Sequence, residues 1–197
     1  MKAILIVSTL LTASIIWANP AQEIYPVNPE IKGQNVINFR PIGVFRTPYS
    51  EKTGAPRQGM LEPETKATIE IESLYREGLA DLDRFEHIIV LYYFNITKTW
   101  SSIVKPPKSH HQFGLFATRS PKRPNPIGFS VVKLDSLDLE AGILHLSGVD
   151  AFDGTPVLDI KPYIPSVDMI DSPKNVETEK ALGHHDEKYI KDSSMYR

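Results

Sequence analysis

The chain has 197 residues, of which 41% are hydrophobic and 23% charged, and its formal net charge at pH 7 is −2. This length and composition suit one globular domain with flanking tails, and they exclude a fibrous or fully disordered protein. The absence of cysteine excludes disulfides, thiolate zinc sites and a cysteine nucleophile.

Residues 1–18 have the pattern of a secretory signal peptide. Lys2 precedes an uncharged apolar run over residues 3–17, which has the length of a signal core and is short for a membrane span. Cleavage after Ala18 predicts a periplasmic or secreted protein, whereas an uncleaved run would attach the protein to a membrane. Residues 19–36 are polar and contain proline, and we interpret them as a linker.

Short stretches rich in β-branched and aromatic residues predict an all-β domain over residues 37–165. The predicted strands span 37–46, 67–71, 87–94, 113–117, 127–137, 143–149 and 157–163. We expect a short helix over 73–79 with Ser73 as its N-cap, and a hairpin turn over 138–142. Many strands with few helices favour an antiparallel barrel or a sandwich. Residues 166–197 are interpreted as a polar C-terminal tail.

The charge distribution is uneven, because no acidic residue lies between Glu86 and Asp135. This window contains the cations Lys98, Lys105, Lys108, Arg119, Lys122, Arg123 and Lys133 and the aromatic residues Trp100, Phe113 and Phe116. Cations and flat apolar faces suit phosphates and stacked bases, so the window predicts an RNA-binding surface. The alternative is a solvated loop whose charges pair with acids elsewhere. The slightly negative net charge implies that any RNA-binding surface is local.

Three polar turns are candidates for ligand binding. Residues 117–128 contain three prolines that fix the backbone around Arg119, whose guanidinium can hold a carboxylate or phosphate through two hydrogen bonds. The turn at 150–156 offers the carboxylate of Asp153 and free N–H groups, and residues 56–59 form a further loop. For each turn the alternative is a purely structural role.

The sequence indicates neither a metal site nor a catalytic residue. His110 and His111 are adjacent and would point to opposite sides of a strand, and His184 and His185 lie in the polar tail. The chain contains no glycine-rich phosphate-binding motif and no nucleophile elbow.

Five motifs, taken in order, resemble the TsaA-like (TrmO-type) family over roughly residues 39–165. They are residues 41–49 (PIGVFRTPY), 56–58 (PRQ), 85–88 (FEHI), 116–128 (FATRSPKRPNPIG) and 153–163 (DGTPVLDIKPY). The resemblance implies a small antiparallel β-barrel with short helices that binds S-adenosyl-L-methionine and works as a homodimer. It also implies N6-methylation of threonylcarbamoyl-adenosine next to the anticodon of tRNA, which would take place in the cytoplasm.

The family motifs imply a set of cofactor-binding residues. They fall on Arg57, Gln58, Asn95, Arg119, Phe129, Asp153, Gly154, Thr155 and Pro156. Asn95 and Ile96 stand where many relatives have His-Gln. The RNA backbone is expected to contact Lys105, Lys108, Lys122 and Arg123. Two other functions stay open: an exported, non-catalytic barrel that binds RNA or an adenosine ligand, and a methyltransferase that acts on a small molecule.

Overall fold

The computed structural model describes residues 24–26, 37–56, 58–106, 109–170, 178, 180 and 181. Ten strands lie within these ranges: β1 (Ile24–Pro26), β2 (Gly43–Arg46), β3 (Lys66–Ile71), β4 (His87–Tyr93), β5 (Thr99–Ser101), β6 (Ile103–Val104), β7 (Phe113–Gly114), β8 (Ile127–Asp138), β9 (Ile143–Ser147) and β10 (Pro156–Pro162). The short helices are η1 (Gly59–Leu61), η2 (Ser73–Leu79), η3 (Leu82–Arg84), η4 (Leu115–Ala117) and α1 (Pro165–Asp168). None of the described helices is long and apolar enough to cross a membrane.

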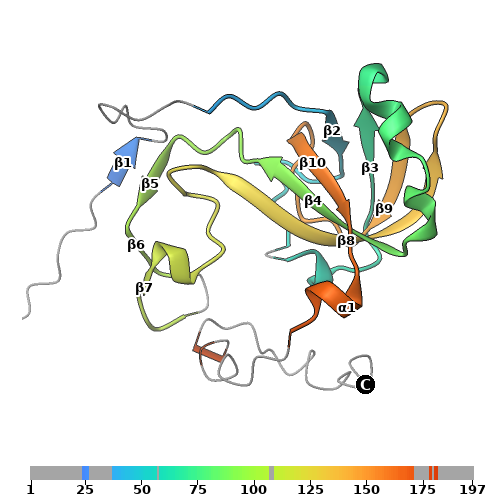
Figure 1. The fold of residues 1–197 in the computed structure, drawn as a ribbon. Helices are drawn as coiled ribbons and strands as arrows, with labels where there is room; N and C mark the ends of the chain where they lie inside the picture. The colour runs from blue at the N-terminus through green and yellow to red at the C-terminus, as the bar shows by residue number, and fades with distance from the viewer. Residues whose placement is uncertain are drawn as a thin grey trace, which may run out of the picture.

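Six of the strands close into an antiparallel barrel in the order β10-β2-β3-β9-β8-β4, as Figure 1 shows. The long strand β8 pairs with β4 along one side and with β9 along the other. The turn between β8 and β9 covers residues 139–142, so the predicted hairpin is confirmed. The prediction of a small all-β barrel is likewise confirmed, and closure of the sheet leaves this part of the protein without a free strand edge.

The interior of the barrel is apolar because alternate residues of each strand point inward. In β4, Ile88, Val90 and Tyr92 are buried while the residues between them are only half-buried. Inward side chains of the other strands include Phe45, Ile69, Val132, Leu144, Leu146 and Val157. Full burial of one such side chain stabilises the fold by about 1.5–3 kcal/mol, so this core holds the loops that carry the polar residues.

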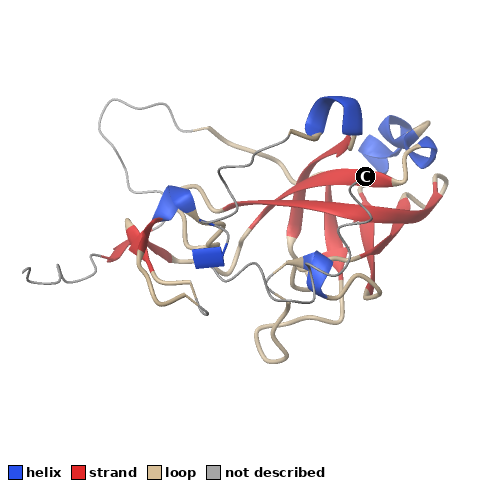
Figure 2. Cartoon of the chain, turned by 90° about the horizontal axis from the view of Figure 1, so that it is seen from below, coloured by secondary structure: helices blue, strands red, loops and turns tan. Residues whose placement is uncertain are grey.

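A small lobe lies beside the barrel. Strand β1 pairs with β5, with Ile24 opposite Ser101, and β6 pairs with β7. Figures 1 and 2 both show the β1–β5 ribbon at a distance from the barrel, linked to it by the chain after β4. At the other end of the sequence, the backbone oxygen of Ala181 accepts a hydrogen bond from the Ser109 hydroxyl at 2.8 Å. Segments near both termini therefore contact the acid-free window, which is the stretch between Glu86 and Asp135.

Several local predictions differ from the structure. The helix at 73–79 is a 3-10 helix whose N-cap is Glu72, with no side-chain capping bond, so the prediction of Ser73 as N-cap was wrong. The strand predicted over 37–46 is regular only in β2, since residues 37–40 are exposed. The stretch predicted as a strand over 113–117 is β7 followed by η4. β1, β5 and β6 were not predicted, because strands of two or three residues are too short to show a period.

Candidate functional site

The loop between β2 and β3 carries Gln58, and its next residue, Gly59, packs against Gly148, which follows β9. Gln58 has extended backbone angles and precedes η1, whose first residue is Gly59. A Cβ atom on Gly59 would lie 1.7 Å from the backbone oxygen of Gly148, so only glycine allows this close approach. The backbone contact therefore fixes the position from which the Gln58 side chain extends.

Gln58, Arg119 and Phe129 meet at the surface although they are far apart in sequence. A guanidinium nitrogen of Arg119 donates a hydrogen bond to the side-chain oxygen of Gln58 at 3.2 Å. The same guanidinium lies 5.8 Å from the centre of the Phe129 ring, which is 46% exposed on β8. Arg119 is exposed and forms no ion pair with a carboxylate of the described residues. Its remaining donors are therefore available to an anionic or carbonyl group of a ligand.

A chain of hydrogen bonds connects three buried or half-buried side chains near this cluster. The Ser130 hydroxyl donates to the Asp150 carboxylate at 2.8 Å. Because Ser130 has only one proton to donate, the Tyr92 hydroxyl donates to Ser130 across 3.0 Å. The positive charge of Arg119 acts on Tyr92, which places this network close to the arginine. Sequence reasoning missed Tyr92 and Ser130 because they lie on strands, where a polar residue carries no distinctive pattern.

Burial raises the pKa values of two groups in this network, the Asp150 carboxyl and the Tyr92 hydroxyl. Removal of the Asp150 carboxyl from water raises its pKa, and hydrogen bonds from Ser130, Tyr92 and backbone groups offset only part of that effect. Burial also raises the pKa of the Tyr92 hydroxyl well above its usual value of 10.0, and the negative charge of Asp150 adds to the rise. Tyr92 is therefore a neutral hydrogen-bond donor across the physiological pH range.

The turn at 153–156 lies between β9 and β10 in the chain and is hydrogen-bonded to the end of β2. The backbone N–H of Thr47 donates to the Asp153 carboxylate at 3.2 Å, and the Gly154 N–H donates to the Phe45 oxygen at 2.9 Å. Thr155 is buried, and its carbonyl accepts from the Phe45 N–H at 3.0 Å. This turn, which ends at Pro156, packs against β2, and no described hydrogen bond links it to Arg119 or Phe129.

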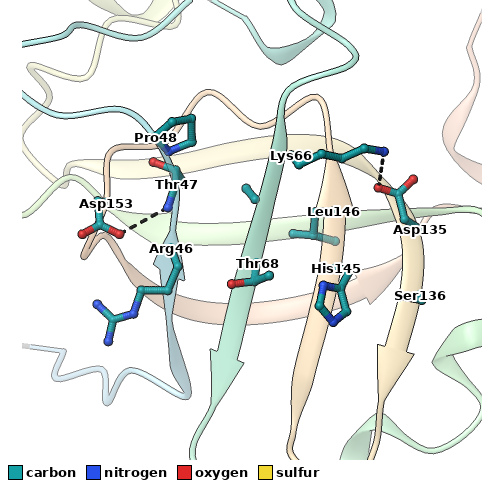
Figure 3. Close-up of a pocket in the computed structure, with 11 residues that line it drawn as sticks. Arg46, Thr47, Pro48, Lys66, Thr68, Asp135, Ser136, His145, Leu146 and Asp153 are labelled. Carbon is teal, nitrogen blue, oxygen red and sulfur yellow. Dashed lines mark hydrogen bonds and ion pairs between the residues drawn. The ribbon is translucent and has the colours of Figure 1, made fainter.

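Asp153 also lines a pocket of about 620 Å³ on the outer wall of the barrel, which Figure 3 shows. Its floor is an in-register row across β2, β3, β9 and β8: Arg46, Thr68, His145 and Ser136. Both cations of the wall are paired, Arg46 with Glu70 at 2.9 Å and Lys66 with Asp135 at 3.0 Å. The wall is therefore charge-balanced and offers no unpaired cation to an anionic ligand.

A β-bulge in β8 places Asp135 beside this pocket. The pairing of β8 with β9 shifts between Leu134 and Ser136, so Asp135 is the extra residue. Burial would raise the pKa of Asp135, but hydrogen bonds from Ser147 and Lys66 outweigh it and lower the pKa below its usual value. Asp135 therefore stays ionised and balances the charge of Lys66.

The remaining predicted residues are distributed over the loops. Asn95 follows β4, is exposed, and accepts a hydrogen bond from Lys98 through its backbone oxygen at 3.2 Å. Lys105 and Lys122 are exposed. Arg57 and Lys108 lie outside the described residues. The structure thus brings three of the predicted cofactor residues into contact, and no described hydrogen bond joins Asn95 or the 153–156 turn to these three.

Arg123 has a defined position that the sequence did not predict. A guanidinium nitrogen of Arg123 donates to the backbone oxygen of Thr118 at 2.9 Å, and the guanidinium carbon lies 5.6 Å from the centre of the Phe116 ring. Phe116 is 79% exposed, whereas Trp100 and Phe113 are half-buried. Phe116 is therefore more accessible than Trp100 and Phe113.

The family model for the N-terminal domain of tRNA-methyltransferase O matches residues 44–169, which is more than half of the chain. The chain belongs to this family. An S-adenosyl-L-methionine-binding protein from Archaeoglobus fulgidus is 40% identical over 67% of the chain and 93% of its own length. The tRNA (adenine(37)-N6)-methyltransferase from Escherichia coli is 39% identical over 68% of the chain and 60% of its own length.

The fold agrees with solved structures of the family. The crystal structure of TrmO from Pseudomonas aeruginosa superposes with a TM-score of 0.58 at 38% identity, over 72% of this chain and 62% of that chain. The resemblance inferred from the five motifs is thereby confirmed. The chain spans less than two thirds of the length of the Escherichia coli and Pseudomonas aeruginosa proteins.

Proposed function

We propose that this protein is an S-adenosyl-L-methionine-dependent methyltransferase that methylates N6 of an adenine in tRNA. The observation that carries this proposal is the match of the barrel to the tRNA-methyltransferase O domain, together with the surface cluster of Gln58, Arg119 and Phe129. Threonylcarbamoyl-adenosine next to the anticodon is the substrate that we propose in particular, from the family resemblance alone.

The residues of the cluster fit the cofactor chemically. S-adenosyl-L-methionine carries a carboxylate, a flat adenine ring and a cationic sulfonium, and when bound it supplies an activated methyl group. Arg119 has donors for the carboxylate, and Phe129 offers an exposed apolar face next to it. The Asp150 carboxyl is hydrogen-bonded to Ser130, the residue that follows Phe129 in β8. We place Arg57, Asn95 and the 153–156 turn among the cofactor contacts on the strength of their motifs.

The protein contributes mainly by positioning. A sulfonium is already a good leaving group, so catalysis requires the two reactants to be held in line rather than a strong general base. Arg119 and Gln58 are held by rigid turns, which limits the entropy lost on binding. We assign no catalytic residue, and none of the described histidines contacts the cluster through a hydrogen bond or ion pair.

The basic residues of the window are proposed to bind the tRNA backbone. Lys105 and Lys122 are exposed and form no ion pair among the described residues. Loss of each phosphate contact lowers the slope of log affinity against log salt by roughly 0.7–0.9. A triple variant in which Lys105, Lys108 and Lys122 become alanine should bind tRNA more weakly and with a shallower salt dependence. Lys161→Ala, on β10 and paired with Asp159, is the control and should change neither.

We also propose that the protein works as a homodimer, as the family resemblance implies. Light scattering at micromolar concentration should give twice the mass of one chain, and a monomer would contradict the proposal.

The proposed reaction is tested by mass spectrometry of tRNA nucleosides from cells with and without the gene. We expect an N6-methylated adenosine derivative that disappears with the gene. Identical nucleoside profiles would reject tRNA as the substrate, and would favour a methyltransferase for small molecules if the purified protein still binds S-adenosyl-L-methionine.

A further inference from the structure

We propose that Phe116 and Arg123 form a stacking platform for a base of the RNA substrate. The platform lies next to the cluster of Gln58, Arg119 and Phe129, which is called the cofactor cluster below. This inference rests on the proposed function and adds to it the side chains that hold the RNA base. It is carried by the exposure of Phe116, the position of Arg123 beside its ring, and the charge of the surrounding segment.

The chain presents Phe116 to solvent from a rigid turn. Its neighbour Leu115 is fully buried, and the Leu115 N–H donates to the Ser102 oxygen at 2.8 Å. The Thr118 hydroxyl and N–H both donate to the Leu115 oxygen, at 2.8 and 3.0 Å. With Leu115 anchored, the short η4 helix directs Phe116 outward. An aromatic ring held in this way loses little conformational freedom when a base stacks on it.

Arg123 completes the platform from the other end of the same turn. Its guanidinium is fixed by the hydrogen bond to the Thr118 oxygen at 2.9 Å and lies 5.6 Å from the centre of the Phe116 ring. Arg119, in the cofactor cluster, lies between these two residues in sequence and is 5.8 Å from the Phe129 ring. One turn therefore supplies the guanidinium groups of two guanidinium–aromatic pairs, of which one belongs to the cofactor cluster and the other is unassigned.

RNA bases stack on aromatic rings and on guanidinium planes, so a Phe–Arg pair offers both kinds of surface. The structure favours Phe116 over Trp100 and Phe113, because those two side chains are half-buried.

The charge around the platform favours RNA over a second copy of the chain. No acidic residue occurs between Glu86 and Asp135, whereas Lys122 and Arg123 follow Phe116 closely. A symmetric dimer contact through this turn would bring the same cations of two chains together, which is unfavourable. An RNA backbone supplies the complementary negative charge.

The test is tRNA binding at several salt concentrations for the wild type, Phe116→Ala, Phe116→Tyr and Arg123→Lys. Leu74→Ala is the matched control, since Leu74 is 80% exposed on η2, outside the acid-free window. Stacking on one aromatic residue corresponds to about a 5- to 150-fold change in affinity. We expect Phe116→Ala to lose affinity in that range at every salt concentration with an unchanged salt slope, because stacking releases no counterions.

Phe116→Tyr should keep wild-type affinity, since the ring is retained, and Arg123→Lys should bind more weakly although its charge is unchanged. All four variants should bind S-adenosyl-L-methionine as the wild type does. Wild-type tRNA affinity in Phe116→Ala would overturn the platform and leave the proposed function intact. Conversion of a dimer to a monomer by Phe116→Ala in light scattering would assign Phe116 to a subunit interface instead. A wild type that binds S-adenosyl-L-methionine but no tRNA would overturn the proposed function itself.

Discussion

The Arg119 guanidinium donates a hydrogen bond to the side chain of Gln58, a residue 61 positions earlier in the chain, at 3.2 Å. This bond joins the proline-rich turn before β8 to the glycine-containing loop between β2 and β3. Two of the five family motifs, separated in the sequence by two barrel strands and part of the small lobe, thereby form one surface.

Arg119→Ala should weaken binding of S-adenosyl-L-methionine by about 1.5–3 kcal/mol, the range for a hydrogen bond to a charged group. Arg119→Lys should restore only part of the loss, because lysine lacks the planar pair of donors. Titration calorimetry measures both, with Arg46→Ala as control, since Arg46 lies on the outer wall and pairs with Glu70. Unchanged affinity in Arg119→Ala would remove this residue from the cofactor site.

Gly128→Ala should destabilise the fold, because a Cβ atom there would lie 2.1 Å from the ring of Tyr92. Such overpacking typically costs about 1–3 kcal/mol. Gly114→Ala is the matched control: its Cβ atom would meet no atom within 4 Å, so its stability should be close to that of the wild type. Urea unfolding compares the three proteins, and equal midpoints for both variants would show that Tyr92 moves aside at no cost.

The folded-state pKa of Asp150 is raised above its usual value by burial, which determines the sign of a pH effect. Between the usual pKa and the raised one, the folded protein binds more protons at this group than the unfolded chain does. Stability should therefore fall as the pH rises through this window. The side chain of Asn in the Asp150→Asn variant cannot ionise, so the free energy of unfolding of this variant should lack the fall with rising pH that Asp150 causes. Urea unfolding at a series of pH values measures the difference, and parallel pH profiles would contradict the assignment.

Residues 1–18, with Lys2 before the apolar run at 3–17, predict an exported protein. Intact mass spectrometry of protein expressed with its native N-terminus should show loss of residues 1–18 or of a segment close to that length. A full-length, soluble species recovered from the cytoplasm would contradict export. Full-length protein in the membrane fraction would instead show that residues 3–17 act as an anchor.

The barrel could be predicted from the sequence because its main strands are long enough for their enrichment in β-branched and aromatic residues to stand out. β4 has this composition throughout, and the β8–β9 hairpin is marked by residues 138–142. The rigid turn around Arg119 could also be predicted, since three prolines restrict its backbone. These predictions depend on local sequence alone.

The contacts that assemble the site could not be predicted in the same way. The Ser130–Asp150 bond and the proximity of Gly59 to Gly148 join segments that are distant in sequence, and only closure of the barrel brings them together. Likewise, the exposure of Phe116 depends on the burial of Leu115 against the small lobe, whose strands are too short to recognise. The family motifs placed Asp153 among the cofactor contacts, whereas within one chain its carboxylate is bonded to Thr47.

The most direct test of the account is methyl transfer with purified components. The protein is incubated with S-adenosyl-L-methionine that carries an isotopically labelled methyl group and with tRNA isolated from cells that lack the gene, and the tRNA is then digested to nucleosides for mass spectrometry. We expect the label on N6 of an adenosine derivative, with threonylcarbamoyl-adenosine as the acceptor, and a greatly reduced yield for Arg119→Ala. Labelled cofactor that binds but leaves every tRNA nucleoside unlabelled would contradict the proposed function.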